Sequence, residues 1–203
     1  MAFTDYKNFA QLQAKYPDLG LETARFIPTN LTNIPINPYL KDELDFNLET
    51  YKSNEYLASE NFVTPILRAV WRPYALKMNY WSHQSIKYDD DLSGVPDYMF
   101  THLKGRQYEV LSYPIITSVE AKAENFVEGW SQCVAQMLAC QKLNKKENSI
   151  MFGIVTTGKI WEFGKLEGMT VVKHPVSYSI EYLQDLVNVL DFFLAEAAKQ
   201  LEN

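Results

Sequence analysis

The sequence is poor in the residues that build covalent or zinc-bound frameworks. Its 203 residues include two cysteines and three histidines. Cys133 and Cys140 fall in a segment with helical periodicity, where a rise of ~1.5 Å per residue would put their Cα atoms roughly 10 Å apart, too far for a disulfide. His83, His102 and His174 are scattered singly, without zinc-ligand spacing. The sequence therefore predicts two buried thiols and no zinc site, and single histidines of this kind are usually structural.

Long apolar runs are also missing. Runs such as residues 150–155 fall far short of the ~20 residues that span a bilayer. Residues 1–5 lack the basic start and apolar core of a secretory signal. No glycine-rich phosphate loop ending in Gly-Lys-Ser or Gly-Lys-Thr occurs, so the sequence predicts no ATP-driven motor. We expect a cytoplasmic protein with no membrane segment and no use of ATP.

Positive charge is scarce as well. Lys and Arg number 19 against 25 Asp and Glu, which gives a formal net charge of −6. Most non-specific affinity for nucleic acid comes from Lys and Arg contacts to phosphates, so this balance disfavours such binding, although a local basic path can coexist with it. Arg68, Arg72, Lys77 and Lys87 could form such a path.

Apolar and aromatic residues, in contrast, are sufficient for a packed core. Hydrophobic residues make up 47% of the chain and aromatic residues 14%. The length fits one domain, and no repeat, low-complexity stretch or linker divides it. We expect residues 1–203 to form a single domain, on which residues 1–50 pack as an extension of helices and loops.

Local patterns predict an alternation of helical and extended blocks. Helices are predicted before Pro17 with Thr4 as N-cap, from Tyr39, from residue 53 to about 72, at residues 125–143 and from about residue 179. Strands are predicted at residues 77–88, 95–103 and 113–122, forming an antiparallel meander, and at residues 150–155, 159–166 and 169–173. The fold class is therefore α/β (α+β), with a mixed central sheet flanked by helices.

The third strand of the meander ends in a pattern with chemical meaning. Side chains alternate between the two faces of a strand, so Ser118, Glu120 and Lys122 should point the same way. Glu120 and Lys122 would then lie roughly 6–7 Å apart along the strand. A carboxylate and an ammonium at this spacing can serve one reacting centre, because one holds a cation while the other orients water and offsets charge on a phosphate.

Asp97 can complete a metal site if its strand lies beside the third one. Mg²⁺ prefers oxygen ligands and is commonly held by one or two carboxylates together with water and substrate oxygens. Asp97 and Glu120 would supply the carboxylates, and the backbone carbonyl of Ala121 a third oxygen. The metal would activate a bound water, and Lys122, whose reference pKa is about 10.4, would position that water as an ammonium.

These motifs resemble the PD-(D/E)XK nuclease superfamily, which has the restriction-endonuclease-like fold. The resemblance rests on Val95-Pro96-Asp97, on Val119-Glu120-Ala121-Lys122 and on the glutamine-bearing helix that follows, and it covers about residues 60–163. The segment from Val119 through Phe126-Val-Glu-Gly-Trp-Ser-Gln-Cys, with Thr156-Thr-Gly-Lys-Ile-Trp downstream, looks like stand-alone relatives of the nuclease domain of type I restriction R subunits.

The resemblance implies a role for each matching residue. Asp97 and Glu120 would bind Mg²⁺ or Mn²⁺, Lys122 would be catalytic, and Glu60 on the preceding helix would join the acidic set. Either Gln132 or Gln136 would match the glutamine that many members carry on the next helix. The expected activity is that of a metal-dependent endonuclease acting on DNA, and analogy suggests a homodimer for double-strand cutting.

Several alternatives stay open at this stage. Glu60 can equally be a solvated helix residue, and the choice between Gln132 and Gln136 is undecided. Glu120 and Lys122 could form an ordinary ion pair. The acidic residues 89–91 are expected to be solvated rather than ligands, because neighbouring side chains on a turn diverge. The alternative function is a catalytically inactive module of the same fold that binds nucleic acid or a protein partner.

Overall fold

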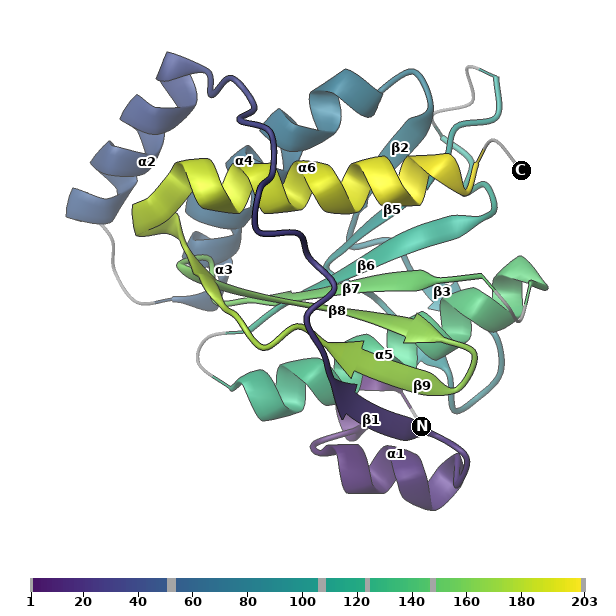
Figure 1. Ribbon diagram of the computed structural model, residues 1–203. Helices are drawn as coiled ribbons and strands as arrows, with labels where there is room; N and C mark the ends of the chain where they lie inside the picture. The colour runs from purple at the N-terminus through teal and green to yellow at the C-terminus, as the bar shows by residue number, and fades with distance from the viewer. Residues whose placement is uncertain (1, 51–53, 106–108, 123–124, 147–148, 202–203) are drawn as a thin grey trace.

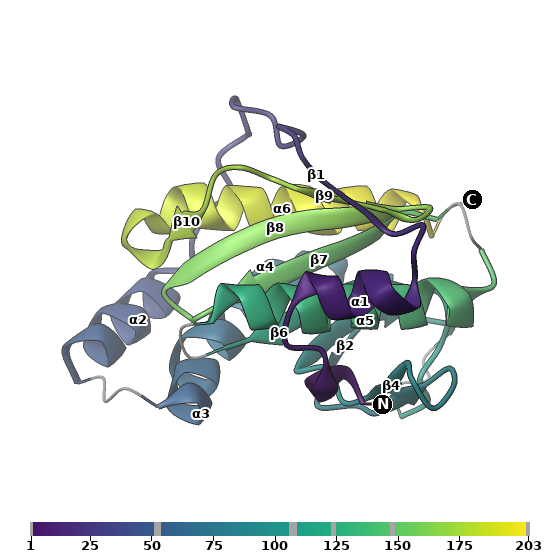
Figure 2. The ribbon, with the colours of Figure 1, turned by 90° about the horizontal axis from the view of Figure 1, so that it is seen from below.

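The computed structural model describes residues 2–50, 54–105, 109–122, 125–146 and 149–201. A twisted sheet forms the middle layer (Figure 1). The last helix crosses one face of this sheet, and the long central helix lies on the opposite face together with the first helix (Figure 2). The predicted fold class, a mixed central sheet flanked by helices, is confirmed.

Eight strands of the described chain make up the main sheet. In spatial order, they are β1 (Gly20–Thr23), β9 (Thr170–Lys173), β8 (Ile160–Glu167), β7 (Met151–Thr156), β6 (Ile115–Ala121), β5 (Tyr98–His102) and β2 (Met78–Ser82), with β10 (Tyr178–Ser179) paired to β8. The pairs β1–β9 and β6–β7 are parallel, and the other pairs are antiparallel. The sheet is therefore mixed.

Helices connect and cover these strands. They are α1 (Phe9–Lys15), α2 (Pro38–Thr50), α3 (Glu55–Ala58), α4 (Thr64–Trp71), α5 (Phe126–Asn144) and α6 (Leu183–Lys199), with a π-helical turn η2 (Ser59–Val63) and the short 3-10 turns η1 (Phe3–Asp5), η3 (Arg72–Tyr74) and η4 (Ile180–Tyr182). None of the helices in the described ranges is both long and apolar enough to cross a membrane.

The region around α5 determines where the candidate site lies. Strands β2, β5 and β6 form an antiparallel meander, as predicted, and α5 then carries the chain across to β7, which runs parallel to β6. Asn125 caps α5 by accepting a hydrogen bond from the backbone N–H of Glu128. The start of β5, the end of β6 and the start of α5 thus meet at one edge of the layer.

Two apolar cores hold the layers together. One packs α4 and α6 on a sheet face through residues such as Ile66, Phe163 and Phe193. The other packs α5 and the N-terminal residues on the opposite face and includes Cys133 and Cys140. Both cysteines are buried free thiols, as predicted, and burial raises the pKa of each.

The prediction of one continuous strand at residues 77–88 is wrong. Strand β2 ends at Ser82, and the next residue has a positive φ of 52°, which breaks the extended conformation. A separate two-stranded sheet then pairs β3 (Ile86–Lys87) with β4 (Ser93–Gly94). The strand predicted to start at residue 95 begins instead at Tyr98.

The acidic turn at residues 89–91 has local partners. The Asp89 carboxylate accepts hydrogen bonds from the backbone N–H groups of Asp91 and Leu92. Asp90 pairs with Lys87 at 2.7 Å, and Asp91 pairs with Lys15. Asp89 and Asp90 are exposed, as expected of solvated residues, and the contacts of all three carboxylates stabilise the turn.

Two predictions near the N-terminus are also corrected. Thr4 lies in η1, and Asn8 caps α1 instead by accepting a hydrogen bond from the backbone N–H of Gln11. Strand β1 was not expected from the sequence. Its four residues are mostly exposed and pair with β9 along the sheet edge, so its stability comes from backbone hydrogen bonds rather than from an apolar pattern.

Candidate active site

The site is built on β6, the strand that the sequence singles out. Every residue of β6 is buried, because α5 covers one face of the sheet and α4 and α6 cover the other. Ser118 and Glu120 point toward α5, where both contact Gln136, whereas Val119 joins the core beneath α4 and α6. The predicted alternation of faces therefore holds at the end of this strand.

Asp97 lies beside the end of β6. The antiparallel register pairs Tyr98 with Val119, so the residue before Tyr98 comes next to Glu120 and Ala121. The Asp97 Oδ2 atom accepts a hydrogen bond of 2.7 Å from the backbone N–H of Ala121. This bond ties the two strand ends together and fixes one oxygen of the Asp97 carboxylate.

Glu120 is a buried acid with a perturbed pKa. Its residue is 4% exposed, and burial together with the negative charge of Asp97 raises the pKa of Glu120 to about 7. The Lys122 ammonium, 3.0 Å from Glu120 Oε1, acts in the opposite direction. A carboxylate with a raised pKa beside a second carboxylate is typical of catalytic sites and of sites that receive a cation.

Gln136 holds the other oxygen of Glu120. Its Nε2 atom donates a hydrogen bond of 2.6 Å to Glu120 Oε2, and its Oε1 atom accepts one from the Ser118 hydroxyl. These buried contacts orient the carboxylate through side chains of both β6 and α5. Of the two glutamines left open by the sequence, Gln136 is therefore the one in direct contact with Glu120.

Gln132 lies one helical turn earlier and has a different partner. Its Nε2 atom donates to Glu128 Oε1 at 2.9 Å, and the same oxygen accepts a hydrogen bond from Lys7. The Gln132 Oε1 atom is buried and has no hydrogen-bond partner among the residues that the structure describes. The positive charge of Lys122 also lowers the pKa of Glu128, which places this group close to the site.

Lys122 follows β6 directly and packs on the first turns of α5. Its backbone N–H donates to the Thr156 carbonyl of β7 at 2.8 Å. A Cβ atom on Gly129 would come within 3.3 Å of Lys122 Cγ and 2.6 Å of Val155 Cγ1. Gly129 thus permits the close approach of α5 that places Lys122 beside Glu120.

Glu60 lies farther from this cluster. It is an exposed residue of η2, on the helical segment that contacts Tyr98 at the start of β5. The Tyr98 hydroxyl hydrogen-bonds with Thr64 and Ser59 of that segment. Burial raises the pKa of Tyr98, and the charges of Asp97 and Glu60 raise it further, so both carboxylates are in its vicinity.

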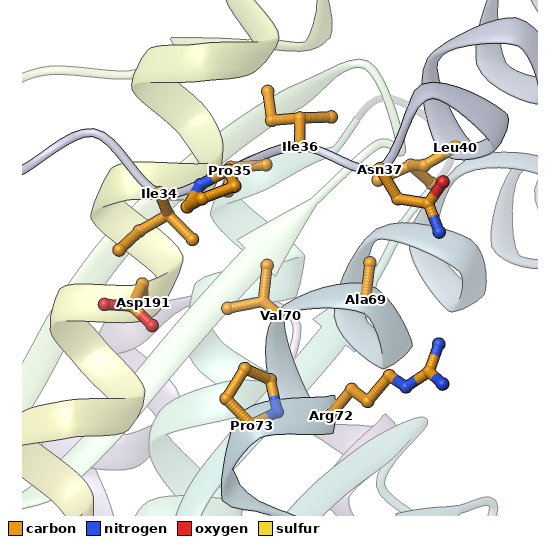
Figure 3. Close-up of a pocket in the computed structure, with 11 residues that line it drawn as sticks. Ile34, Pro35, Ile36, Asn37, Leu40, Ala69, Val70, Arg72, Pro73 and Asp191 are labelled. Carbon is orange, nitrogen blue, oxygen red and sulfur yellow. The ribbon is translucent and has the colours of Figure 1, made fainter.

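A groove begins beside Glu60 and follows α4. Its larger cavity, of about 640 Å³, is lined by Glu60, Thr64 and Arg68 together with Tyr39 and Glu43 of α2. An adjoining cavity of about 350 Å³ shares Arg72 with the first and continues to Asp191. Its apolar walls are residues 34–36 on one side and residues of α4 on the other (Figure 3).

The donor set of the cluster suits a hard divalent cation. Asp97 and Glu120 provide two carboxylates close enough for one charge to raise the pKa of the other. Within the described ranges, no three His, Cys, Asp or Glu side chains are arranged as a metal site, so the two carboxylates would need water, substrate or a backbone oxygen as further ligands. Mg²⁺ and Mn²⁺ commonly bind in this way.

No sequence pattern marks His83 as a residue of this cluster. His83, the residue after β2, lies with its Nε2 atom 3.7 Å from Asp97 Oδ1. A single histidine without ligand spacing could not have been recognised from the sequence as part of a site. The pairing of Lys7 with Glu128 was likewise unpredictable, because the two residues are 121 positions apart.

Comparison with known proteins adds no family to this description. No protein-family model matches the chain, and no curated protein matches it at a significant level.

Proposed function

We propose that the protein is a divalent-metal-dependent nuclease of the restriction-endonuclease-like fold that hydrolyses phosphodiester bonds of DNA. One observation carries this proposal: Asp97, Glu120 and Lys122, the three residues of the sequence motif, come together where β5, β6 and α5 meet, with Gln136, one of the two candidate glutamines, in contact with Glu120. The order of meander, crossing helix and parallel strand around them supports the fold assignment.

Asp97 and Glu120 would hold Mg²⁺ or Mn²⁺ in this function. The bound cation would lower the pKa of a water molecule and stabilise negative charge that develops at phosphorus. The chain itself orients the two carboxylates through the Ala121 N–H and the Gln136 amide. A carboxylate oxygen of Glu60 and the carbonyl oxygen of Ala121 are proposed as further ligands of this cation.

Lys122 provides the positive charge of the site. As an ammonium 3.0 Å from Glu120, it is placed to donate hydrogen bonds to an attacking water and to an oxygen of the scissile phosphate. It is 20% exposed along its side chain, so substrate can reach it. The exposed Arg68 and Arg72 in the groove along α4 are candidates for contacts with phosphates farther along the strand.

Cleavage of DNA with and without Mg²⁺ or Mn²⁺ tests the proposal. Asp97→Asn and Lys122→Ala should each abolish cleavage while the far-ultraviolet circular dichroism stays that of the unchanged protein. Asp90→Asn and Lys146→Ala are matched controls, because they remove an exposed acid and an exposed lysine elsewhere and should leave cleavage intact. Cleavage that persists in both site variants would refute the assignment.

The net charge of −6 favours a second function, a module of the same fold that binds nucleic acid or a protein without cleaving. In that case, the ion pair between Lys122 and Glu120 would be a permanent structural contact. Calorimetry distinguishes the two functions, because a folded protein that takes up neither Mg²⁺ nor Mn²⁺ supports the binding module.

A further inference from the structure

His83 has an unusual backbone conformation next to Asp97. Its φ of 52° lies in the left-handed region that few residues other than glycine adopt. The conformation directs its backbone N–H to the Asp97 carbonyl, at 2.9 Å, and brings its ring to the carboxylate of the same residue. Main chain and side chain of His83 thus both approach Asp97.

Among the described residues other than glycine, Lys145 also has a positive φ, and its conformation has an ordinary explanation. Lys145, at 55°, follows the last turn of α5, where a left-handed residue commonly ends a helix. His83 ends no helix, since it follows strand β2. Strained residues of this kind are concentrated at functional sites, where the surrounding structure maintains them.

The ring of His83 is oriented by its own neighbour. Its Nδ1 atom lies 2.8 Å from the Ser82 hydroxyl, and its Nε2 atom lies 3.7 Å from Asp97 Oδ1. If the Ser82 hydroxyl donates to Nδ1, the neutral ring carries its proton on Nε2, which faces the carboxylate. The ring also makes a T-shaped contact with the Tyr98 ring, with centroids 5.9 Å apart.

The two oxygens of Asp97 therefore have different neighbours. Oδ2 accepts the hydrogen bond from the Ala121 N–H, and Oδ1 faces the His83 ring. The hydrogen bond holds Oδ2, while the His83 ring, 3.7 Å from Oδ1 and so beyond hydrogen-bonding distance, places a polar group on the other side of the carboxylate. Groups that orient a metal-binding carboxylate in this way strongly affect its affinity for the metal.

We propose that His83 is a positioning residue, which acts through Asp97 by holding its carboxylate in the orientation that binds a divalent cation together with Glu120. This inference rests on the proposed nuclease function and adds a residue that the sequence motif does not contain. The substitution His83→Gly isolates the ring, because glycine adopts a φ of 52° without strain and keeps the backbone N–H.

Binding of Mn²⁺, measured by calorimetry, and cleavage at varied Mn²⁺ concentration test this proposal. In His83→Gly, we expect Mn²⁺ affinity to fall about tenfold, within the range found for outer-sphere partners of metal ligands. The Mn²⁺ concentration for half-maximal cleavage should rise accordingly, while the KM for DNA at saturating Mn²⁺ stays unchanged. His83→Asn tolerates the left-handed conformation and keeps a side-chain donor, so it should recover part of the affinity.

Lys145→Gly is the matched control, because it relieves the same backbone strain at an exposed position directly after α5. It should change thermal stability as His83→Gly does but leave Mn²⁺ binding unaltered. Unchanged Mn²⁺ affinity in His83→Gly would overturn the positioning role even if the nuclease assignment stands on the Asp97 and Lys122 variants. A wild-type protein that neither cleaves DNA nor binds Mn²⁺ would overturn both.

Discussion

The side-chain amide of Gln136 donates a hydrogen bond of 2.6 Å to Oε2 of the buried Glu120. Through this bond, the middle of α5 fixes the orientation of a carboxylate at the end of β6. Gln136 receives a hydrogen bond in turn from Ser118, two residues before Glu120 on the same strand. Of the two glutamines that the sequence could not distinguish, Gln136 is the one that contacts Glu120. Substitutions of the two residues can therefore be compared directly.

Gln136→Leu and Gln132→Leu should have unequal effects. The first leaves Glu120 Oε2 without its amide donor in a buried setting, so the free energy of unfolding should fall by about 1–3 kcal/mol and cleavage should be severely reduced. The second removes the hydrogen bond to Glu128 but also removes a buried oxygen that has no partner among the described residues, so the free energy of unfolding should fall by less than about 1 kcal/mol. Urea denaturation measures both, and equal losses would contradict this assignment.

The raised pKa of Glu120 predicts a pH dependence of stability. In the absence of divalent metal, the folded protein retains the Glu120 proton up to about pH 7, whereas the unfolded chain releases it near its ordinary pKa of 4.5. This group's contribution is therefore fully present below pH 4.5 and is lost as pH rises toward 7. Melting temperatures recorded in EDTA should show this loss in the wild type but not in Glu120→Gln.

Glu128→Gln is the control for this measurement. The pKa of Glu128 is lowered, mainly by the hydrogen bond from Lys7, so its contribution has the opposite sign and is lost as pH falls. If the melting temperature falls equally between pH 4.5 and 7 in the wild type and in Glu120→Gln, a group other than Glu120 causes the fall.

Gly129→Ala should destabilise the protein although alanine favours helices. The added Cβ would lie 2.6 Å from Val155 Cγ1 and 3.3 Å from Lys122 Cγ, so α5 or Lys122 must move. Overpacking of this kind costs about 1–3 kcal/mol, which offsets the helix-propensity gain of about 1 kcal/mol. Gly20→Ala is the control, because its Cβ would meet neighbours at ordinary distances of 3.6 Å or more. Cleavage should fall in the first variant and not in the second.

Arg68→Ala combined with Arg72→Ala should weaken DNA binding without abolishing the chemistry at saturating DNA. If each arginine neutralises a phosphate, the slope of log affinity against log salt should become smaller by about 2. Fluorescence anisotropy over a salt series measures this slope. The pair Lys104→Ala and Lys146→Ala, which removes two exposed cations away from the groove, should leave it unchanged. An unaltered slope in the arginine variant would exclude the groove as a binding path.

The sequence predicts elements best where one physical pattern dominates. Helix α5 and strand β7 were placed within one or two residues, because one has a sustained helical period and the other a continuous apolar run. The segment before β5 was predicted less well, since the positive φ of His83 interrupts the extended pattern after Ser82. Strand β1 could not be predicted, because it depends on a partner about 150 residues later in the chain.

The candidate site was predictable to the extent that its residues share strands or a motif. Asp97, Glu120 and Lys122 follow from alternation within β6 and from the pairing of neighbouring strands. The choice of Gln136 depends on how α5 crosses the sheet, which side-chain spacing alone does not determine. The contacts of His83 depend on one backbone torsion angle, and no residue pattern encodes it.

Burial of all seven residues of β6 means that Glu120 belongs to the most protected part of the fold. Amide hydrogens in a central strand with neighbours on both sides exchange only when the whole domain opens. The backbone that carries Glu120 is therefore expected to open only together with the whole domain. The more exposed side chains of the cluster are those of His83 and Asp97, which lie at the end of the strand rather than in its centre.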